Sequence, residues 1–509
     1  MQDYDVIVIG AGNGGLAGAA FAAKNGFKTL VVEKHNIPGG SATSFRRGRF
    51  EFEASLHELC NLGSEDNKGG IWNLFELLGS DCEWKTSYAE TFRMLVPNED
   101  IDVTMPCGVP NFIGKLEQEC PGSAPIMMQV AQLGGMAAQA YAALDEPGLD
   151  MDEFNAKYPD FYRLAGHSIK EVLTALGMPE KAQKIVSNYW CYLGANWEEL
   201  DFLIYARMLM AYIVYGAGFP AKFSHEISMS LDKVIRDNGG EIWYNTEVEK
   251  MIVEDGKVAG IVLDGKEYRS KYIISNAYPD VVYGKMMDQD QVPERANKLT
   301  RSRELGLSFV TVYLGMNKTS EELGIEAYST FISDSGDSTV CQAAATNTHD
   351  FTKYVIINCL NNIVEDATPA GTSQLFLTTA YFGNGWDDVT ADNYWQIKED
   401  IAEQCIKYCE ENLGIEIMPY IEEIEIATPV TFARYLNSPN GTPYGYQVKP
   451  GDSFIERGYT LKDETFFDNL FFAGAASKRG DGYSSTYLSG IDAGKAVLIN
   501  ERMKGGVER

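Results

Sequence analysis

Near the N-terminus, an apolar run, a cluster of glycines and a second apolar run follow one another. Residues 5–10 are apolar and β-branched, as in a strand buried on both faces, and they lead directly into the glycines. Residues 16–24 are rich in alanine and leucine, which favours a helix, and Gly26 follows as a C-terminal stop. A second apolar strand covers residues 29–33. The pattern predicts a strand, a tight turn, a helix and a strand in sequence.

The glycine spacing in this unit is typical of a site for the diphosphate of a dinucleotide. Gly10 permits the sharp turn, Gly12 lets the backbone approach a pyrophosphate, and Gly15 lets helix and strand pack closely. The helix N-terminus supplies free N–H groups and a partial positive charge. Glu33 ends the second strand, where an acid accepts hydrogen bonds from a ribose diol. An ordinary glycine-rich turn is disfavoured because strands, helix and acid occur in the required order, but the motif alone allows NAD or FAD.

A loop of small residues leaves this unit and is followed by a basic segment. Gly39, Gly40 and Ser41 would allow the backbone to run beside a ligand. Residues 46–53 alternate as in a hairpin, and their three arginines are either solvated or include one that reaches the diphosphate. His57 lies in the next loop.

The middle of the chain changes from strands to helices. Residues 69–78 have a helical pattern, residues 84–106 alternate as strands, and residues 111–226 read as mainly helical. Residues 200–220 approach the length of a membrane span but carry Asp201 and Arg207 and no basic flank. We therefore expect a buried helix that lines an apolar cavity.

Alternating strands return in the second half. A helix over 223–238 precedes residues 241–268, where two Asp-Gly dipeptides between alternating apolar residues predict a three-stranded meander. An apolar strand then ends near Asn276. The remaining expected elements are strands over 307–314, 354–360 and 375–382 and a helix over 393–413.

The C-terminal part carries a second glycine signature. Residues 468–477 read as a strand ending in Ala-Gly, and a helix rich in small residues begins near Tyr483 and continues to about residue 501. The N-terminus of that helix would direct free N–H groups and positive dipole at whatever precedes it. In a flavoprotein, that position is the pyrimidine edge of the flavin.

Composition narrows the class of partner. The formal net charge of −29 and the lack of a basic stripe make nucleic acid an unsuitable partner. This charge also opposes simple electrostatic docking on anionic membranes, although a local apolar patch could contact lipid. The nine cysteines form no CxxC pair or zinc spacing, which favours free thiols in a reducing compartment and no metal site. The N-terminus has neither the basic stretch nor the apolar segment of a secretory signal peptide, so we expect a cytoplasmic protein.

With these motifs in place, the chain resembles the FAD-dependent phytoene desaturase, prolycopene isomerase and retinol saturase family, which is related to amine oxidases. The resemblance covers both ends and the centre of the chain; the helical region and residues 290–425 match only in general layout. The matching segments are residues 6–52, 239–279, 428–435, 441–446 and 469–497.

The resemblance implies FAD as the cofactor, held by residues from all three regions. The implied cofactor-binding residues are Gly10, Gly12, Gly14, Gly15, Glu33, Lys34, Gly39, Gly40, Ser41, Val248, Asn276, Gly474, Ala475, Gly482, Tyr483 and Ser484. Two departures stand out. Ala475 replaces the aspartate with which relatives bond the ribityl chain, and Pro220 is followed by Ala-Lys-Phe instead of a glycine pair.

The fold class that follows is α/β, with three parts. We expect a discontinuous Rossmann-like FAD-binding domain with a three-stranded meander, a mixed-sheet substrate domain, and a helical insert or lid. The expected ranges are 1–85, 226–290 and 436–509 for the first, 86–110 and 291–435 for the second, and 111–225 for the third.

The resemblance also implies the reaction class. We expect saturation, desaturation or redox-neutral isomerisation of C=C bonds in a carotenoid, retinoid or unsaturated fatty acid, with hydride passing between flavin N5 and a substrate carbon. Candidate proton handlers are His57, Lys222, Tyr444 and Tyr483. No HExxH, GxSxG or paired-carboxylate spacing supports hydrolysis or metal chemistry. A flavin amine oxidase and a non-catalytic lipid or flavin carrier are the alternatives. The electron partner, a peripheral membrane contact and a homodimer remain open.

Overall fold

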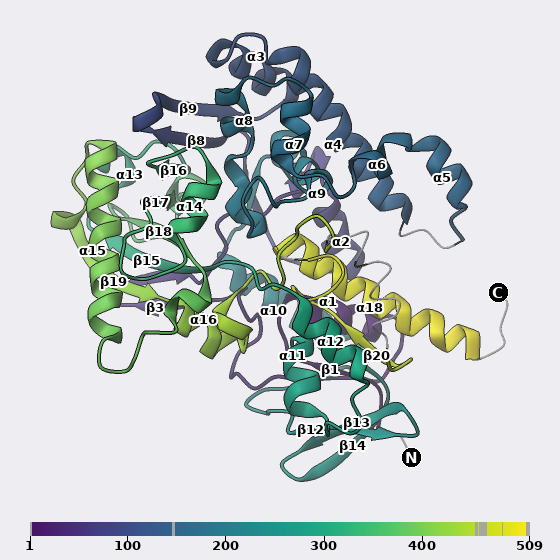
Figure 1. The fold of residues 1–509 in the computed structure, drawn as a ribbon. Coiled ribbons are helices and arrows are strands. Elements are labelled where there is room, and N and C mark those ends of the chain that lie inside the picture. Colours follow the sequence, from purple (N-terminus) through teal and green to yellow (C-terminus); the bar gives the residue numbers. More distant parts are fainter. Residues whose placement is uncertain (1–2, 145–147, 453–456, 458–465, 481, 505–509) are drawn as a thin grey trace.

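The computed structural model describes residues 3–144, 148–452, 457, 466–480 and 482–504. Figure 1 shows two sheets and a group of helices: the N-terminal sheet at the bottom, a second sheet at the left, and the helices of the chain's middle at the top. The mixed α/β class expected from the sequence is confirmed, since both sheets contain seven strands and helices pack on each.

The N-terminal sheet collects strands from three separated regions of the sequence. Its centre is parallel, with β1 between β2 and β14, and β20 paired to the other side of β14. Every residue of β1 except Asp5 is buried, because helices cover both faces of a parallel sheet. The strands are β11(Glu241–Trp243), β2(Thr29–Val32), β1(Tyr4–Ile9), β14(Lys266–Ser275), β13(Lys257–Leu263), β12(Lys250–Glu254) and β20(Leu470–Phe472).

The expected meander is present as β12, β13 and β14, joined by two tight turns. Asp255 and Gly256 have φ of 50° and 73°, and Asp264 and Gly265 have 47° and 70°, as two-residue hairpins with a right-handed twist require. The third strand is longer than the sequence suggested. It continues to Ser275 as the parallel neighbour of β1, so the meander and the apolar strand before Asn276 share one strand.

Three helices cover this sheet: α1(Asn13–Lys24), α10(Phe223–Asp237) and α18(Tyr483–Lys504). The first and last of these cross closely. A Cβ on Gly490 would lie 2.1 Å from the carbonyl oxygen of Gly14, and one on Gly18 would lie 3.0 Å from the carbonyl oxygen of Gly490. The small residues of both helices therefore let their backbones touch.

The second sheet is mixed and largely antiparallel. Its order is β19(Ile421–Ala427), β15(Ser308–Met316), β18(Ser373–Tyr381), β17(Tyr354–Cys359), β16(Ser329–Ser333), β8(Glu90–Val96) and β9(Ile101–Pro106). The long helix α15(Tyr394–Leu413) packs on one face through Ile401, Cys405 and Cys409, which belong to a hydrophobic core with residues of β15, β17 and β18. This core lies apart from the one under the N-terminal sheet.

Residues 109–144 and 148–215 form the helical part. Its helices are α3(Val109–Glu119), α4(Ala124–Leu144), α5(Met151–Lys157), α6(Pro159–Leu164), α7(Ile169–Ala175), α8(Glu180–Val186) and α9(Phe202–Tyr215). The expected apolar helix is α9, which ends before the short strand β10(Ala217–Pro220). Within the described residues, no helix has the length and apolar character needed to cross a bilayer.

Short elements connect these parts. They are the hairpin β3(Ser44–Arg47) and β4(Phe50–Glu53), the pair β5(Gly63–Ser64) and β6(Asn67–Lys68), β7(Trp84–Ser87), and the helices α2(Gly70–Leu78), α11(Pro279–Val281), α12(Glu294–Ser302), α13(Ser320–Leu323), α14(Ser338–Ala344) and α16(Pro429–Leu436). All nine cysteines are free thiols.

Candidate functional site

Two large cavities lie along the junction of the three parts. The first, of about 580 Å³, follows the ends of β1 and β2 and is faced by α16. The second, of about 630 Å³, lies among residues 55–61 and the helices α4, α9 and α18. Both volumes fall in the range of small-molecule and cofactor sites.

The first cavity begins at the glycine turn. Gly10 has a φ of +90°, and Gly12 caps α1 without any side-chain hydrogen bond, so the first turn of α1 faces the cavity. A Cβ on Gly14 would lie 2.4 Å from the backbone nitrogen of Gly474, which excludes any larger residue there. The buried Oδ1 of Asn13 accepts no hydrogen bond in the described part of the chain. An anion-binding helix terminus and an unsatisfied polar group thus meet at this point.

Glu33 lies at the end of β2 and is buried. Its Oε2 accepts a hydrogen bond from the Ala11 N–H at 2.6 Å, and its Oε1 accepts one from the His35 N–H at 2.8 Å. These two bonds hold the carboxylate at the cavity wall, where each oxygen retains a further lone pair for a hydroxyl donor.

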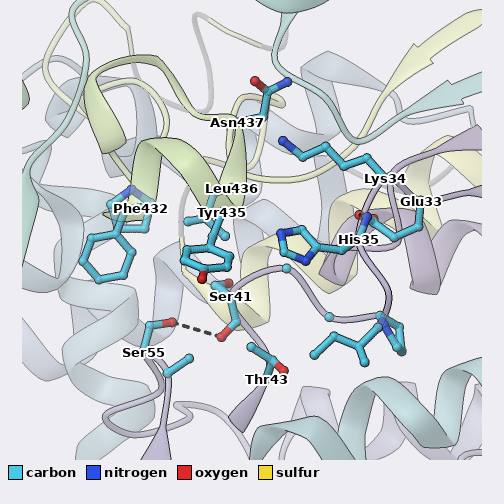
Figure 2. Close-up of a pocket in the computed structure, with 18 of the residues that line it drawn as sticks. Glu33, Lys34, His35, Ser41, Thr43, Ser55, Phe432, Tyr435, Leu436 and Asn437 are labelled. Atoms are coloured by element: carbon cyan, nitrogen blue, oxygen red, sulfur yellow. Dashed lines mark hydrogen bonds between the residues drawn. The ribbon is translucent and has the colours of Figure 1, made fainter. Parts of the chain in front are cut away.

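Helix α16 faces Glu33 from across the first cavity, as Figure 2 shows. The rings of His35 and Tyr435 are stacked, with centroids 5.4 Å apart and an interplanar angle of 28°. Phe432 and Leu436 of the same helix also line the cavity. This contact joins the segment after β2 to the part of the chain that follows the second sheet.

Asn276 ties the end of β14 to the glycine turn. Its Oδ1 accepts a hydrogen bond from the Gly15 N–H at 3.1 Å, and its side chain lies directly over Gly12. On the neighbouring strand end, the Gly474 N–H donates to the Ser489 hydroxyl of α18 at 2.8 Å. The two glycine signatures therefore meet in space.

Most of the expected cofactor residues line the first cavity. These are Gly10, Gly12, Gly14, Glu33, Lys34, Gly39, Gly40, Ser41, Val248, Asn276, Gly474 and Ala475. Gly15 lies behind the turn, where a Cβ would meet the Gly10 carbonyl oxygen at 2.0 Å. Gly482, Tyr483 and Ser484 line the second cavity instead.

The three arginines of the β3–β4 hairpin pair with glutamates. Arg46 binds Glu51 on the same hairpin, and Arg49 binds Glu422 across the gap to β19. Arg47, which binds Glu425 at 2.7 Å, is the one arginine among these three that lines the first cavity.

The second cavity has mostly apolar walls and a polar inner segment. Helix α9 lines it, as its apolar composition predicts, and α4 contributes small residues such as Gly135 and Ala138. A Cβ on Gly135 would meet nothing within 4 Å, so this side of α4 borders open space. The chain segment 55–61 forms the opposite wall and includes His57 and Glu58.

His57 has a neutral ring. Burial lowers the pKa of its imidazole to about 4, because the charged form loses its hydration there. Its Nε2 lies 3.1 Å from the Thr378 hydroxyl of β18, and its ring lies 6.3 Å from that of Tyr192. Tyr444, a third ring lining this cavity, packs against Phe309.

Six residues line both cavities: Asn13, Ser41, Ser55, Phe432, Pro443 and Thr486. Tyr483 organises this junction. Its hydroxyl donates to the Ser41 carbonyl oxygen at 2.8 Å and lies 3.0 Å from the Ser55 hydroxyl, which in turn lies 3.2 Å from the same carbonyl oxygen. Burial raises the pKa of Tyr483, so its hydroxyl keeps its proton.

Lys222 is the expected candidate that the structure does not bring to the site. Its side chain is 73% exposed, its Nζ lies 3.9 Å from Glu226, and it lines neither cavity. Pro220 pairs with Trp84 in a small sheet, so the residues that follow it turn outward to the start of α10.

Sequence reasoning missed several residues at the junction. Asn13 occupies a variable position of the glycine motif, and Ser55 and Thr486 have no distinguishing neighbours in sequence. Glu58 follows His57 directly, yet nothing in the sequence shows that it is 7% exposed. Its proximity to His57 was the one available signal.

The residues present fit FAD. The first cavity has a glycine turn at a helix N-terminus and a buried acid at the end of the second strand, and it adjoins a second, mostly apolar cavity. This arrangement matches a dinucleotide with a ring system at one end. Figure 2 shows Glu33 and Ser41 on the walls of the first cavity. Among the described residues, no group of three or more His, Cys, Asp or Glu side chains is arranged to hold a metal ion.

Comparison with known proteins gives relatives of two kinds. The chain is 24% identical to a prolycopene isomerase from Daucus carota over 96% of its own length and 79% of the relative's. It is 24% identical to an all-trans-retinol 13,14-reductase from Danio rerio, with 93% and 82% of the two chains covered.

Among solved structures, an oxidoreductase from Methanosarcina mazei has a TM-score of 0.65 at 16% identity, covering 96% of this chain and all of that one. A putrescine oxidase bound to putrescine has a TM-score of 0.64 at 14% identity, covering 99% of this chain and all of that one. These structures show that the fold is that of amine oxidase-like flavoproteins.

The model of the FAD binding domain family matches residues 5–277, which contain β1, β2, β14, the meander and the glycine turn. The match extends over more than half of the chain. The chain therefore belongs to the FAD binding domain family of oxidoreductases, and its cofactor is FAD.

Proposed function

We propose that this protein is an FAD-dependent oxidoreductase that acts on C=C bonds of a long lipophilic substrate, by saturation, desaturation or redox-neutral isomerisation. The observation that carries the proposal is the shared wall of the two cavities at Ser41, Ser55 and Asn13. A ring system at that junction would be reached from the first cavity by the rest of the cofactor and from the second by a substrate.

In this proposal FAD lies along the first cavity. Glu33 accepts hydrogen bonds from the ribose diol, the N–H groups at the start of α1 face the diphosphate, and Val248 faces the adenine through its backbone. Gly482, Tyr483 and Ser484, at the start of α18, face the flavin end. When bound, the flavin supplies two-electron hydride chemistry, and the protein supplies position and electrostatics.

The substrate occupies the second cavity. Its walls are mostly apolar, His57 is neutral, and α9 and α4 leave open space beside Gly135. Support for C=C chemistry comes from the relatives that are named prolycopene isomerase and all-trans-retinol 13,14-reductase. Tyr483, Tyr444 and His57 remain the candidate proton handlers; Lys222 is left out because it lies at the surface.

The domain division follows the same assignment. Residues 1–85, 226–290 and 436–509 would carry the cofactor, residues 86–110 and 291–435 would form the floor of the substrate site, and residues 111–225 would cover it. The membership of the two sheets supports these ranges, and so does the grouping of the helices α3 to α9.

A substitution that fills the second cavity tests the proposal. Gly135→Leu places a side chain into open space on α4, whereas Gly114→Leu does so on α3, away from both cavities. Both changes favour the helix by up to about 1 kcal/mol. We expect both proteins to bind FAD, and we expect only Gly135→Leu to lose turnover of all-trans-retinol or a cis-carotenoid at least tenfold.

Flavin-free purified protein, or equal turnover by the two variants, would contradict the proposal. Hydrogen peroxide formation with putrescine and none with the lipids would indicate an amine oxidase instead. Bound FAD that no substrate or donor reduces, with lipid co-purifying, would indicate a carrier.

A further inference from the structure

Glu58 is a carboxyl group enclosed in the wall of the second cavity. The residue is 7% exposed, and both carboxyl oxygens are buried without a hydrogen-bond partner in the described part of the chain. Burying a polar group without a hydrogen bond destabilises the fold, and burying an ionised group does so more strongly. A role in the reaction would explain why an acid occupies this buried position despite its cost to stability.

The groups that act on the Glu58 carboxyl are uncharged or acidic, although Arg207, Arg479 and Lys495 line other parts of the same cavity. The hydroxyls of Tyr189 and Tyr192 lie near the carboxyl, but Tyr189 donates its hydrogen bond to the Thr91 carbonyl oxygen at 2.5 Å. Glu90 also raises the pKa of Glu58 through its charge. In turn, Glu58 raises the pKa values of five further neighbours: Tyr212, Tyr328, Cys60, Cys107 and Cys191. No described cation contributes, so burial raises the pKa of Glu58 to about 8. At pH 7 the group is a neutral carboxylic acid.

The other groups of this wall with a shifted pKa keep one protonation state near neutral pH, so none of them can store an exchangeable proton. The pKa of His57 is lowered to about 4, and the pKa values of Tyr192, Tyr212 and Tyr483 are raised by burial. A proton donor or acceptor works best when its pKa lies near the working pH. Among the lining groups with a shifted pKa, Glu58 alone meets this condition.

Tyr192 lies next to Glu58 and lines the same cavity. Its ring lines the cavity and is half-buried, while its hydroxyl is buried without a hydrogen-bond partner among the described residues. The backbone beside Glu58 is held in place, because Leu59 and Gly218 exchange hydrogen bonds of 2.8 and 3.1 Å. The Tyr192 hydroxyl and the Glu58 carboxyl therefore lie side by side in a rigid wall of the second cavity, close enough for the hydroxyl to stabilise the carboxylate.

We propose that Glu58 stores the proton that is exchanged with the substrate and that the Tyr192 hydroxyl passes it into the cavity. The proposal rests on the proposed function. In the saturation direction, FAD that a two-electron donor has reduced would supply a hydride to one carbon of the C=C bond, and the Tyr192 hydroxyl would give its proton to the other carbon. The π bond breaks, two C–H bonds form, and FAD is left oxidised. Tyr192 takes the Glu58 proton, and water later reprotonates the carboxylate. Desaturation runs these transfers in reverse.

Infrared spectroscopy of the FAD-loaded protein tests the store without any substrate. We expect a carbonyl band of a protonated carboxylic acid that shifts in D₂O and disappears with a midpoint near pH 8. The band should be lost in Glu58→Gln and kept in Glu90→Gln, a matched control at a half-buried glutamate outside both cavities. A band from Glu53, whose pKa burial also raises to about 8, should remain in both variants. The proposal is overturned if Glu58→Gln leaves the spectrum unchanged or if the band does not exchange in D₂O.

Single-turnover measurements with all-trans-retinol and a cis-carotenoid test the transfer. We expect Glu58→Gln to slow the step by about 100-fold or more and to remove a break near pH 8. Tyr192→Phe should keep the infrared band yet slow the step equally, and Glu58→Asp should restore part of the rate. An unchanged rate and pH profile in Glu58→Gln would refute the role. If neither probe is turned over by wild type while the band behaves as expected, the proposed function fails and the proton store stands.

Discussion

Glu33 offers the most direct test of how FAD is held. Its carboxylate accepts two backbone hydrogen bonds in the structure and is proposed to accept a further one from the ribose diol of FAD. Glu33→Gln keeps the size of the side chain but leaves one acceptor oxygen where there were two. One of the N–H groups of Ala11 and His35, now bonded at 2.6 and 2.8 Å, then loses its partner. The amide also lacks the negative charge that strengthens a bond from a ribose hydroxyl.

The expected magnitudes follow from these bonds. A lost partner for a buried N–H costs about 1–3 kcal/mol of folding stability. A hydrogen bond to a charged acceptor contributes about 1.5–3 kcal/mol, and each 1.4 kcal/mol is tenfold in affinity. Glu33→Gln should therefore raise the Kd for FAD by about 10- to 100-fold, and Glu33→Ala should raise it further.

Titration of the flavin-free protein with FAD, followed by quenching of flavin fluorescence, measures these constants. Glu241→Gln is the matched control, because Glu241 is exposed on β11 beside β2 and lines neither cavity. Circular dichroism confirms that each variant is folded. A folded Glu33→Gln protein with wild-type affinity for FAD would show that this carboxylate does not hold the ribose.

Three further predictions concern other parts of the structure. Tyr435→Ala removes the ring stacked on His35, a contact of about 0.5–1.5 kcal/mol, so FAD should dissociate about 2- to 10-fold faster in stopped-flow displacement; an unchanged rate would mean that α16 does not retain the cofactor. Gly490→Ala forces a methyl group to 2.1 Å from the Gly14 carbonyl oxygen, so Tm should fall by an amount equivalent to about 1–3 kcal/mol, and an unaltered Tm would contradict the close crossing. For His57, with a folded pKa of about 4 and an ordinary value of 6.5, the unfolded state binds more protons between these values, so the free energy of unfolding should decrease as pH falls from about 6.5 to 4. His57→Gln should lessen that decrease in denaturant titrations, and an identical pH dependence would refute the buried neutral ring.

Local chemistry made the cofactor half of the fold predictable. Gly10 and Gly12 adopt the turn that their spacing predicts, and the Asp-Gly pairs at 255–256 and 264–265 form the two hairpin turns. These features depend on backbone conformation within a few residues, which sequence encodes directly. The length of β14 was harder to foresee, because its second half is fixed by pairing with β1 more than 250 residues earlier.

The substrate half depended on contacts that sequence does not display. Glu58 owes its raised pKa to burial among residues that are far away in the chain, such as tyrosines of η2(Asn188–Leu193) and α9, and Tyr328 just before β16. Lys222 resembled a site residue by its place after Pro220, but the pairing of that proline with Trp84 directs it outward. The burial of Glu58 and the outward orientation of Lys222 set the chemistry of these residues. Both arise only once the chain is folded.

The crossing of α1 and α18 has a consequence for biosynthesis. The helix that carries the first glycine turn rests on Gly490, and the strand that completes the edge beside β14 begins at Leu470. A ribosome adds residues 25–469 after α1 before β20 and α18 can cover these surfaces, so the N-terminal unit stays incomplete while the second sheet and the helices are synthesised. The complete FAD site therefore forms only after α18 has been made, and until then the face of α1 that meets α18 stays uncovered.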